Sequence, residues 1–151
     1  MRTKIKLSSA LLLIVFLGLI FNYVSKPAKG MPILLYHMVN DGGSSYAINP
    51  KNFDEQMKYL KEQGYETISL LEYAKARKGK VALPEKPIVI SFDDGYLDNY
   101  TVAMPIMEKY NFKGTVFVVG NDIGKKGYLS YDDISNLQKH NCELAAHTSN
   151  H

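Results

Sequence analysis

Two short motifs hold the side chains of this sequence that could do chemistry. Asp93 and Asp94 directly follow an apolar run, and His147 and His151 lie four residues apart at the end of the chain. Two histidines at this spacing can face one way on a helix or tight turn and bind one cation through their imidazole nitrogens. Catalytic zinc typically takes three protein ligands and leaves one position for water. The sequence therefore predicts a metal-hydrolase site, with Asp94 as the third ligand.

The two aspartates are expected to have different roles, because adjacent side chains of a strand point to opposite faces. Asp94 would bind the metal, and Asp93 would accept a proton. Gly95 follows and lets the backbone turn sharply, close to a ligand. Each motif also has a plainer interpretation, since Asp-Asp-Gly is a common turn and two such histidines can be surface or capping residues. The glutamate of an HExxH metalloprotease is absent between the histidines, so a base has to come from elsewhere.

The elements that must position these motifs alternate between strand and helix patterns. Strands are predicted at residues 31–36, 87–92, 113–119 and 142–146. Helices are predicted around Phe53, Met57 and Leu60 with a stop at Gly64, at 70–78 with an end at Gly79, at 99–110 with an interruption at Pro105, and from the capping-box pair Ser130 and Asp133 to about Lys139. Such alternation predicts an α/β fold with a parallel sheet or barrel and ligands at the carboxyl ends of the strands. Both motifs follow such an end.

Composition and charge are those of an ordinary globular protein with a short basic end. The chain has 151 residues, of which 46% are hydrophobic and 22% are charged, and this length fits one domain. The net charge of +3 comes from Arg2, Lys4 and Lys6, because the rest of the chain holds equal numbers of basic and acidic side chains. No basic surface is therefore expected for nucleic acid. The single cysteine, Cys142, excludes an internal disulfide framework and is expected to fill space in the core.

The first residues have the pattern of a targeting segment. Three cations precede an apolar run at residues 7–24, and roughly 17–25 apolar residues span a bilayer. Cations at this end favour a cytoplasmic start and an extracytoplasmic remainder. We expect residues 1–24 to be a signal anchor, with a cleaved signal peptide or a buried core helix as the alternatives, and residues 25–30 to be a linker. The protein is therefore expected outside the cytoplasm, anchored to the membrane or secreted.

Both motifs resemble those of a known enzyme family. Residues 91–95, Ser-Phe-Asp-Asp-Gly, look like the first motif of the polysaccharide deacetylases of carbohydrate esterase family 4, the NodB-homology domain. Residues 147–151, His-Thr-Ser-Asn-His, look like the second motif. The resemblance covers residues 31–151 and implies a distorted (β/α)7 barrel, of which this chain would be the N-terminal portion.

The resemblance also implies a role for each candidate residue. Asp93 would be the catalytic base, and the ligands of Zn²⁺ or a similar divalent ion would be Asp94, His147 and His151. Residues 35–37, Leu-Tyr-His, resemble the family's Leu-x-His motif as placed in the poly-N-acetylglucosamine deacetylase branch, which makes His37 a candidate general acid. The alternative is a histidine that caps a strand end or is hydrogen-bonded near Tyr36.

Two residues after the first motif have a more modest interpretation. Tyr96 and Asn99 are expected to shape the loop and to cap the following helix, and the alternative is that they line the cleft.

The implied reaction is hydrolysis of the N-acetyl group of an N-acetylglucosamine polysaccharide, either peptidoglycan or poly-N-acetylglucosamine. The metal would acidify water and polarise the acetamido carbonyl, Asp93 would take a proton from that water, and a histidine would protonate the departing amine. Acetate would be released. The expected partners are the polysaccharide and, through the N-terminal helix, the membrane at a bacterial cell surface.

Two other functions stay open. The family's arginine motif and its aromatic or hydrophobic acetyl-pocket motif are absent, and the sequence contains no Trp. We therefore expect a deacetylase domain truncated at its C-terminus, because about 120 residues after the linker is short for a closed barrel of roughly 200–250. Such a chain could be a non-catalytic glycan-binding remnant. A glycosidase could also use paired carboxylates, but it has no use for two histidines at this spacing.

Overall fold

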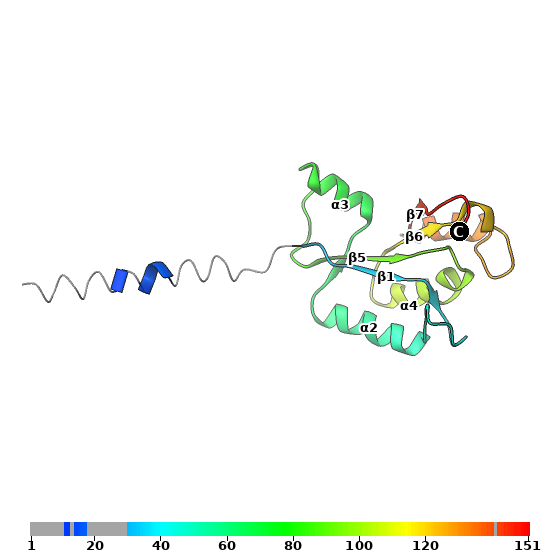
Figure 1. Cartoon of the computed structure of the whole chain (residues 1–151), viewed down its shortest axis with the longest axis horizontal. Coiled ribbons are helices and arrows are strands. Elements are labelled where there is room, and N and C mark those ends of the chain that lie inside the picture. The colour runs from blue at the N-terminus through cyan, green and yellow to red at the C-terminus, as the bar shows by residue number, and fades with distance from the viewer. Residues whose placement is uncertain (1–10, 13, 18–29, 141) are drawn as a thin grey trace, which may run out of the picture. The chain divides into compact units, whose positions relative to one another are not determined.

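The computed structural model describes residues 11–12, 14–17, 30–140 and 142–151 (Figure 1). The chain divides into two units, residues 1–30 and residues 31–151. Residues 11–12 and 14–17 are helical, and the rest of the predicted anchor at residues 1–24 lies outside the described residues, as does the predicted linker apart from Gly30. None of the helices within the described residues has the length and apolar character that a membrane span requires.

A parallel sheet forms the centre of residues 31–151. Its strands run in the order β1 (Ile33–Tyr36), β5 (Pro87–Phe92), β6 (Gly114–Val118) and β7 (Cys142–Ala146), and β4 (Glu66–Thr67) pairs with the start of β5. A separate parallel pair joins β2 (Met38–Val39) to β3 (Ala47–Ile48). The predicted α/β class and all of the long strands are thereby confirmed. Closure into a seven-stranded barrel stays a prediction.

The strand register brings the two motifs to one edge of the sheet. Tyr36 pairs with Phe92, Phe92 with Val116, and Val116 with Leu144, so the carboxyl ends of the four strands are nearly level. The backbone N–H of Asp93 then donates to the carbonyl of Tyr36 at 2.9 Å. Parallel strands with level ends gather their following loops at one place. The residues after β1, β5 and β7 are therefore neighbours in space.

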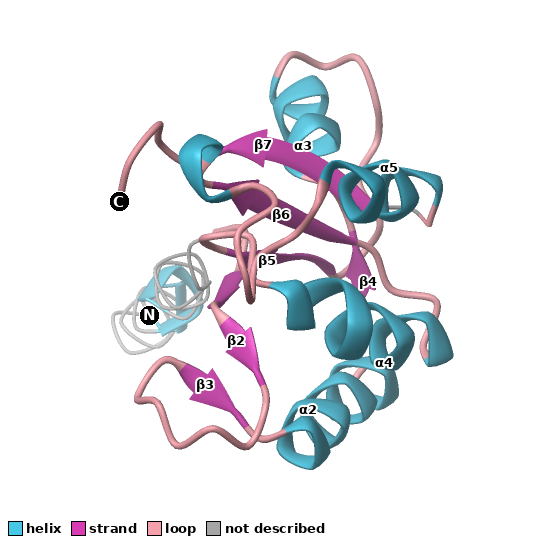
Figure 2. Cartoon of the chain, turned by 90° about the vertical axis from the view of Figure 1, so that its right-hand side faces the viewer, coloured by secondary structure: helices cyan, strands magenta, loops and turns pink. Residues whose placement is uncertain are grey.

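Helices connect the strands and cover the sheet. They are α2 (Pro50–Glu62), α3 (Leu70–Arg77), α4 (Met104–Lys109) and α5 (Tyr131–Lys139), together with a π-helix η1 (Asn99–Ala103) and a short 3₁₀ helix η2 (Gly120–Asp122). Figure 1 shows α2 and α4 on one side of β1 and β5 and α3 on the other, and in Figure 2 α5, α4 and α2 follow one another along one side of the strands.

Local sequence explains where these helices begin and end. The side chain of Asn49 accepts hydrogen bonds at the start of α2, and Phe53, Met57 and Leu60 form its buried face. Gly64 follows α2 with a φ of +76°, which suits glycine. The predicted capping box of Ser130 and Asp133 opens α5.

Pro105 explains the π-helix in the connection between β5 and β6. Pro105 has no N–H to donate to the preceding turn, and its ring crowds the carbonyl four residues back. The turn before it widens instead, and the N–H of Met104 donates to the carbonyl of Asn99, five residues back. The interruption predicted at Pro105 is therefore a change of helix type rather than a break.

The core lies between β5 and the helices. All of β5 after Pro87 is buried, as expected for a strand covered on both faces. An aromatic cluster holds the carboxyl end of the sheet against α2, with ring centroids 5.0 Å apart for Tyr36 and Phe53, and 5.7 Å apart for Tyr36 and Phe92. Because Tyr36 and Phe92 directly precede His37 and Asp93, this packing fixes the base of the site.

Candidate metal-binding active site

Asp94 lies at a strained turn directly after β5. Its φ is +72°, a left-handed conformation that is uncommon for residues other than glycine. Its side chain is buried, and its Oδ1 atom has no hydrogen-bond partner among the described residues. A buried carboxylate oxygen without a partner is costly unless a cation or another donor reaches it. The backbone strain and the buried oxygen that accepts no hydrogen bond both indicate that this turn is built to present a carboxylate.

The two histidines follow β7 on a loop and not on a helix. The N–H of His147 donates to the carbonyl of Val118 at 2.9 Å, which continues the pairing of β6 and β7. The carbonyls of Thr148 and Ser149 then accept from the N–H groups of Gly120 and Asn121 at 2.9 and 3.0 Å. These backbone contacts hold the loop beside η2.

The histidine side chains point back toward the end of β5. The Nε2 atom of His151 lies 3.1 Å from Oδ1 of Asp94, and the Nε2 atom of His147 lies 3.8 Å from the same oxygen. The two imidazole rings are 5.3 Å apart between centroids. The predicted pair of histidines thus converges on one carboxylate oxygen.

These three side chains could hold a metal ion. One potential ligand atom from each of Asp94, His147 and His151 lies within 4.8 Å of the other two. Two imidazole nitrogens and a carboxylate oxygen are a donor set that suits zinc at a catalytic site. Oδ1 of Asp94 accepts no hydrogen bond although Nε2 of His151 lies 3.1 Å from it, and this second observation fits two ligand atoms that share a cation. The predicted metal ligands are therefore brought together by the fold.

Asp93 lies closer to the metal group than strand alternation predicts. Its Oδ2 atom is 3.5 Å from Nε2 of His147, so both aspartates approach the same imidazole. The expectation that the two point to opposite faces is wrong, because β5 ends at Phe92 and the positive φ of Asp94 breaks the extended geometry on which alternation depends. Two carboxylates at one edge can still have different chemical roles.

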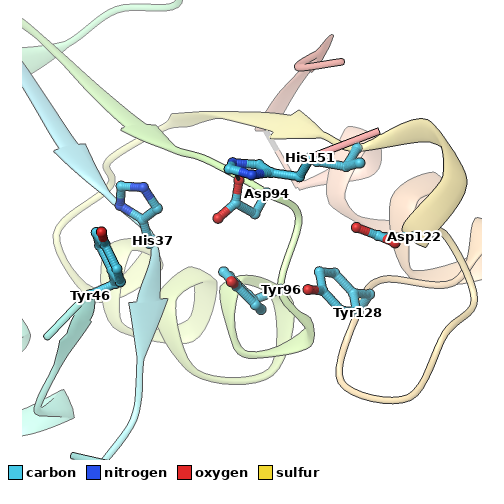
Figure 3. A pocket seen from close by; sticks show the side chains of 8 residues that line it. His37, Tyr46, Asp94, Tyr96, Asp122, Tyr128 and His151 are labelled. Atoms are coloured by element: carbon cyan, nitrogen blue, oxygen red, sulfur yellow. Dashed lines mark ion pairs between the residues drawn. The ribbon is translucent and has the colours of Figure 1, made fainter. Parts of the chain in front are cut away.

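A cleft of about 450 Å³ opens beside Asp94. The residues that line it are His37, Tyr46, Asp94, Tyr96, Val119, Asp122, Tyr128 and His151. Figure 3 shows His37 beside Tyr46 on one side and Tyr128 near Asp122 on the other, with Asp94 and His151 between them. Asp93 and His147 are outside this lining set. The structure thus brings His37 to the cleft that the metal group borders.

Several lining residues were missed or misinterpreted from the sequence. Tyr46, Asp122 and Tyr128 carry no motif; Tyr46 reaches the cleft from the turn before β3, and the other two reach it from the connection between β6 and α5. Tyr96 lines the cleft, which was the alternative to a purely loop-shaping role. The capping role predicted for Asn99 is wrong, because the residue at the N-cap of η1 is Asp98, and the side-chain amide of Asn99 donates to the carbonyl of His37 at 2.7 Å.

Tyr96 and Tyr128 form one wall of the cleft. Their rings stack with centroids 5.0 Å apart, and their backbones form an antiparallel bridge. Burial raises the pKa of Tyr96 to about 12, with further contributions from Tyr128 and Asp94. A tyrosine hydroxyl is protonated at neutral pH, and this shift keeps that of Tyr96 protonated in alkaline solution as well, so it can donate a hydrogen bond to a ligand oxygen in the cleft.

The turn after Asp94 should tolerate only glycine. Gly95 has a φ of +73°, and an added Cβ would lie 2.9 Å from Cγ1 of Val118. We expect Gly95→Ala to lower the free energy of unfolding by at least about 2 kcal/mol, because backbone strain and overlap add. Gly43→Ala is the matched control, since Gly43 has a φ of +72° but open space around it. The control should lose only about 1 kcal/mol in urea unfolding, and equal losses would show that the contact with Val118 does not matter.

The fold and the site together define a class of protein: an α/β protein with a candidate metal site at the carboxyl ends of parallel strands. Residues 80–151 match the polysaccharide deacetylase family. This part of the chain is similar to polysaccharide deacetylases, and the resemblance predicted from the two motifs is confirmed.

Named relatives and a solved structure agree with this family. YxkH of Bacillus subtilis, a candidate polysaccharide deacetylase by its name, is 37% identical over 126 residues, which are 83% of this chain and 44% of that protein. The poly-β-1,6-N-acetyl-D-glucosamine N-deacetylase of Escherichia coli is 31% identical over 98 residues, which are 63% of this chain and 15% of that protein. The structure of Streptococcus pyogenes deacetylase PplD in complex with acetate aligns with a TM-score of 0.72 at 29% identity, over 80% of this chain and 57% of that chain. The chain thus spans less than half the length of these two curated relatives.

Proposed function

We propose that the protein catalyses metal-dependent hydrolysis of the N-acetyl group of N-acetylglucosamine units in a polysaccharide, with release of acetate. The observation that carries this proposal is the convergence of Asp94, His147 and His151 within 4.8 Å, at the border of a cleft that also contains His37. The family match and the names of the relatives support the same reaction. Amide hydrolysis needs an activated water and a proton for the leaving amine, and this edge of the sheet offers groups for both.

The metal ligands in this proposal are Asp94, His147 and His151, and the expected ion is Zn²⁺. A divalent ion bound there would polarise the acetamido carbonyl and lower the pKa of water to roughly 7. The fixed turn at Asp94 and the backbone contacts of the histidine loop would hold the ligands in place before the ion binds.

Two further residues would move protons. Asp93 is the proposed base, because its carboxylate lies next to the metal group through its 3.5 Å approach to His147 and remains partly exposed. His37 is the proposed acid, because it faces the same cleft from the end of β1 and would protonate the departing nitrogen. The hydroxyl of Tyr96, which is protonated at neutral pH, would donate a hydrogen bond to the sugar or to the acetamido oxygen.

The proposed substrates are poly-N-acetylglucosamine or peptidoglycan. The first is supported by the name of the Escherichia coli relative. An apolar N-terminal segment after three cations supports a place outside the cytoplasm, with residues 1–24 as a signal anchor and residues 25–30 as a linker. For residues 31–151 we propose a place within a distorted seven-stranded barrel, in keeping with the parallel order of the strands.

The test is acetate release from defined oligosaccharides. The protein is stripped with a chelator, reloaded with Zn²⁺, and incubated with β-1,4- and β-1,6-linked N-acetylglucosamine pentamers, and free acetate and new amino groups are measured. We expect acetate and amines in equal amounts, only after metal is restored. Chain cleavage without acetate would indicate a glycosidase, and binding of the pentamers without release would indicate a glycan-binding protein.

A further inference from the structure

Asn99 connects the turn after the first motif to the candidate acid. The residue is 1% exposed, and it begins the π-helix that follows the Asp93-Asp94 turn. Its side-chain amide donates to the backbone carbonyl of His37 at 2.7 Å, across 62 positions of sequence. Its Oδ1 atom is buried and has no hydrogen-bond partner among the described residues. A buried amide whose oxygen lacks a partner is costly, and the 2.7 Å bond to His37 offsets part of that cost.

A second contact from the same turn reaches the same segment. The side-chain amide of Asn40 donates to Oδ2 of Asp98 at 2.5 Å. The N–H of Met38 donates to the carbonyl of Tyr46 at 3.2 Å, and the ring of Tyr46 lies 5.2 Å from the imidazole of His37. The segment that carries His37 is thus fixed by the turn on one side and by the tyrosine loop on the other.

We propose that Asn99 is a positioning residue that holds the imidazole of His37 at the correct place across the cleft from Asp94 and His151. This inference rests on the proposed function. In the reaction, the C–N bond of the acetamido group breaks as His37 gives a proton to the nitrogen, and the nitrogen leaves as an amine. Without that proton the nitrogen is a poor leaving group. A displacement of about 1 Å can cost about 100-fold in rate, so a bond that fixes the backbone of His37 bears directly on this step.

The helix type supports this role. If residues 99–109 formed a regular α-helix, the side chains of the first turn would point in other directions than they do here, for the same orientation of the residues after Pro105. The π-turn adds a residue to that turn, and such turns occur frequently at functional sites. Asn99 is thereby buried toward His37 while Ala103 and Met104 remain in the core.

The experiment compares two leaving groups. One substrate is the N-acetylglucosamine pentamer, whose amine must be protonated as it leaves, and the other is 4-nitrophenyl acetate, whose phenolate leaves without a proton. We expect Asn99→Leu, which is similar in size but has no donor, to lower kcat on the pentamer at least about 10-fold with KM within about twofold. The rate of ester hydrolysis and the zinc content should stay within about twofold of the wild-type values. His37→Ala should show the same pattern with a larger loss on the pentamer, about 100-fold.

The matched control is Thr101→Val in the same π-helix. The hydroxyl of Thr101 is exposed and donates to the carbonyl of Leu97 at 3.3 Å rather than to His37, so this variant should leave both activities unchanged. Asn99→Ser is a second variant in case leucine is not accommodated. Equal losses on both substrates, no loss on either, or loss of zinc and fold in both Asn99 variants would overturn the inference. If the wild-type protein hydrolysed the ester but released no acetate from the pentamer, the proposed function would be overturned as well. The wild-type result thus tests the proposed function, and the Asn99 variants test the positioning role.

Discussion

Asp94→Asn is expected to abolish stoichiometric zinc binding. The substitution keeps the size of the side chain but removes the negative charge of the buried oxygen that lies 3.1 Å from His151 and 3.8 Å from His147. Loss of an anionic ligand should weaken zinc binding by more than the 10–100-fold that supporting residues contribute, so we expect at least about a 100-fold rise in Kd. Titration calorimetry on the stripped protein and metal content after gel filtration measure this directly.

Asp122→Asn is the control for that experiment. Asp122 also lines the cleft and carries a carboxylate, but that carboxylate pairs with Lys125 at 2.7 Å and is not one of the three grouped ligands. Zinc binding should be unchanged in this variant. If Asp94→Asn kept one zinc per chain at the original affinity, the metal would have to bind elsewhere. Asp94 would then not be a metal ligand.

Asp93→Asn is expected to separate metal binding from turnover. Asp93 lies beside the metal group but outside it, so the variant should keep one zinc per chain. An amide cannot accept the proton of the attacking water, and loss of a general base typically costs about 100- to 10,000-fold. We therefore expect acetate release from the pentamer to fall by about 1,000-fold at saturating zinc.

The zinc content of Asp93→Asn decides between two roles. Since Oδ2 of Asp93 is only 3.5 Å from His147, the carboxylate could instead help to bind the ion. Loss of zinc together with activity would make Asp93 a ligand and would leave the base unassigned. Restored activity at higher zinc concentration would lead to the same conclusion.

Most of the elements could be predicted because their sequence patterns are long. The apolar run of β5, the helical spacing of Phe53 and Met57, and the capping box at Ser130 are local signals that agree with the final packing. The short strands β2, β3 and β4 could not be predicted, since each has two residues and so no periodicity. They form because other segments of the same chain offer backbone partners: β2 pairs with β3, and β4 pairs with β5.

The candidate site was predictable to the extent that it follows strand ends. Asp94, His147 and His151 were expected together because they follow parallel strands, and the structure gathers them. The orientation of Asp93 could not be predicted, because it depends on a left-handed residue that the sequence does not mark. Tyr46 and Tyr128 reach the cleft only through tertiary contacts between loops, for which a single sequence has no signal.

The separation of the three candidate ligands along the chain links metal supply to stability. Asp94 follows β5, whereas His147 and His151 follow β7, so an ion bound by all three would crosslink two loops more than fifty positions apart. An ion that binds only the folded chain stabilises it by about 2.7 kcal/mol at a free concentration one hundred times the Kd. Metal binding would then be part of the folding free energy. Heat resistance of this protein would consequently rise and fall with the zinc available around it.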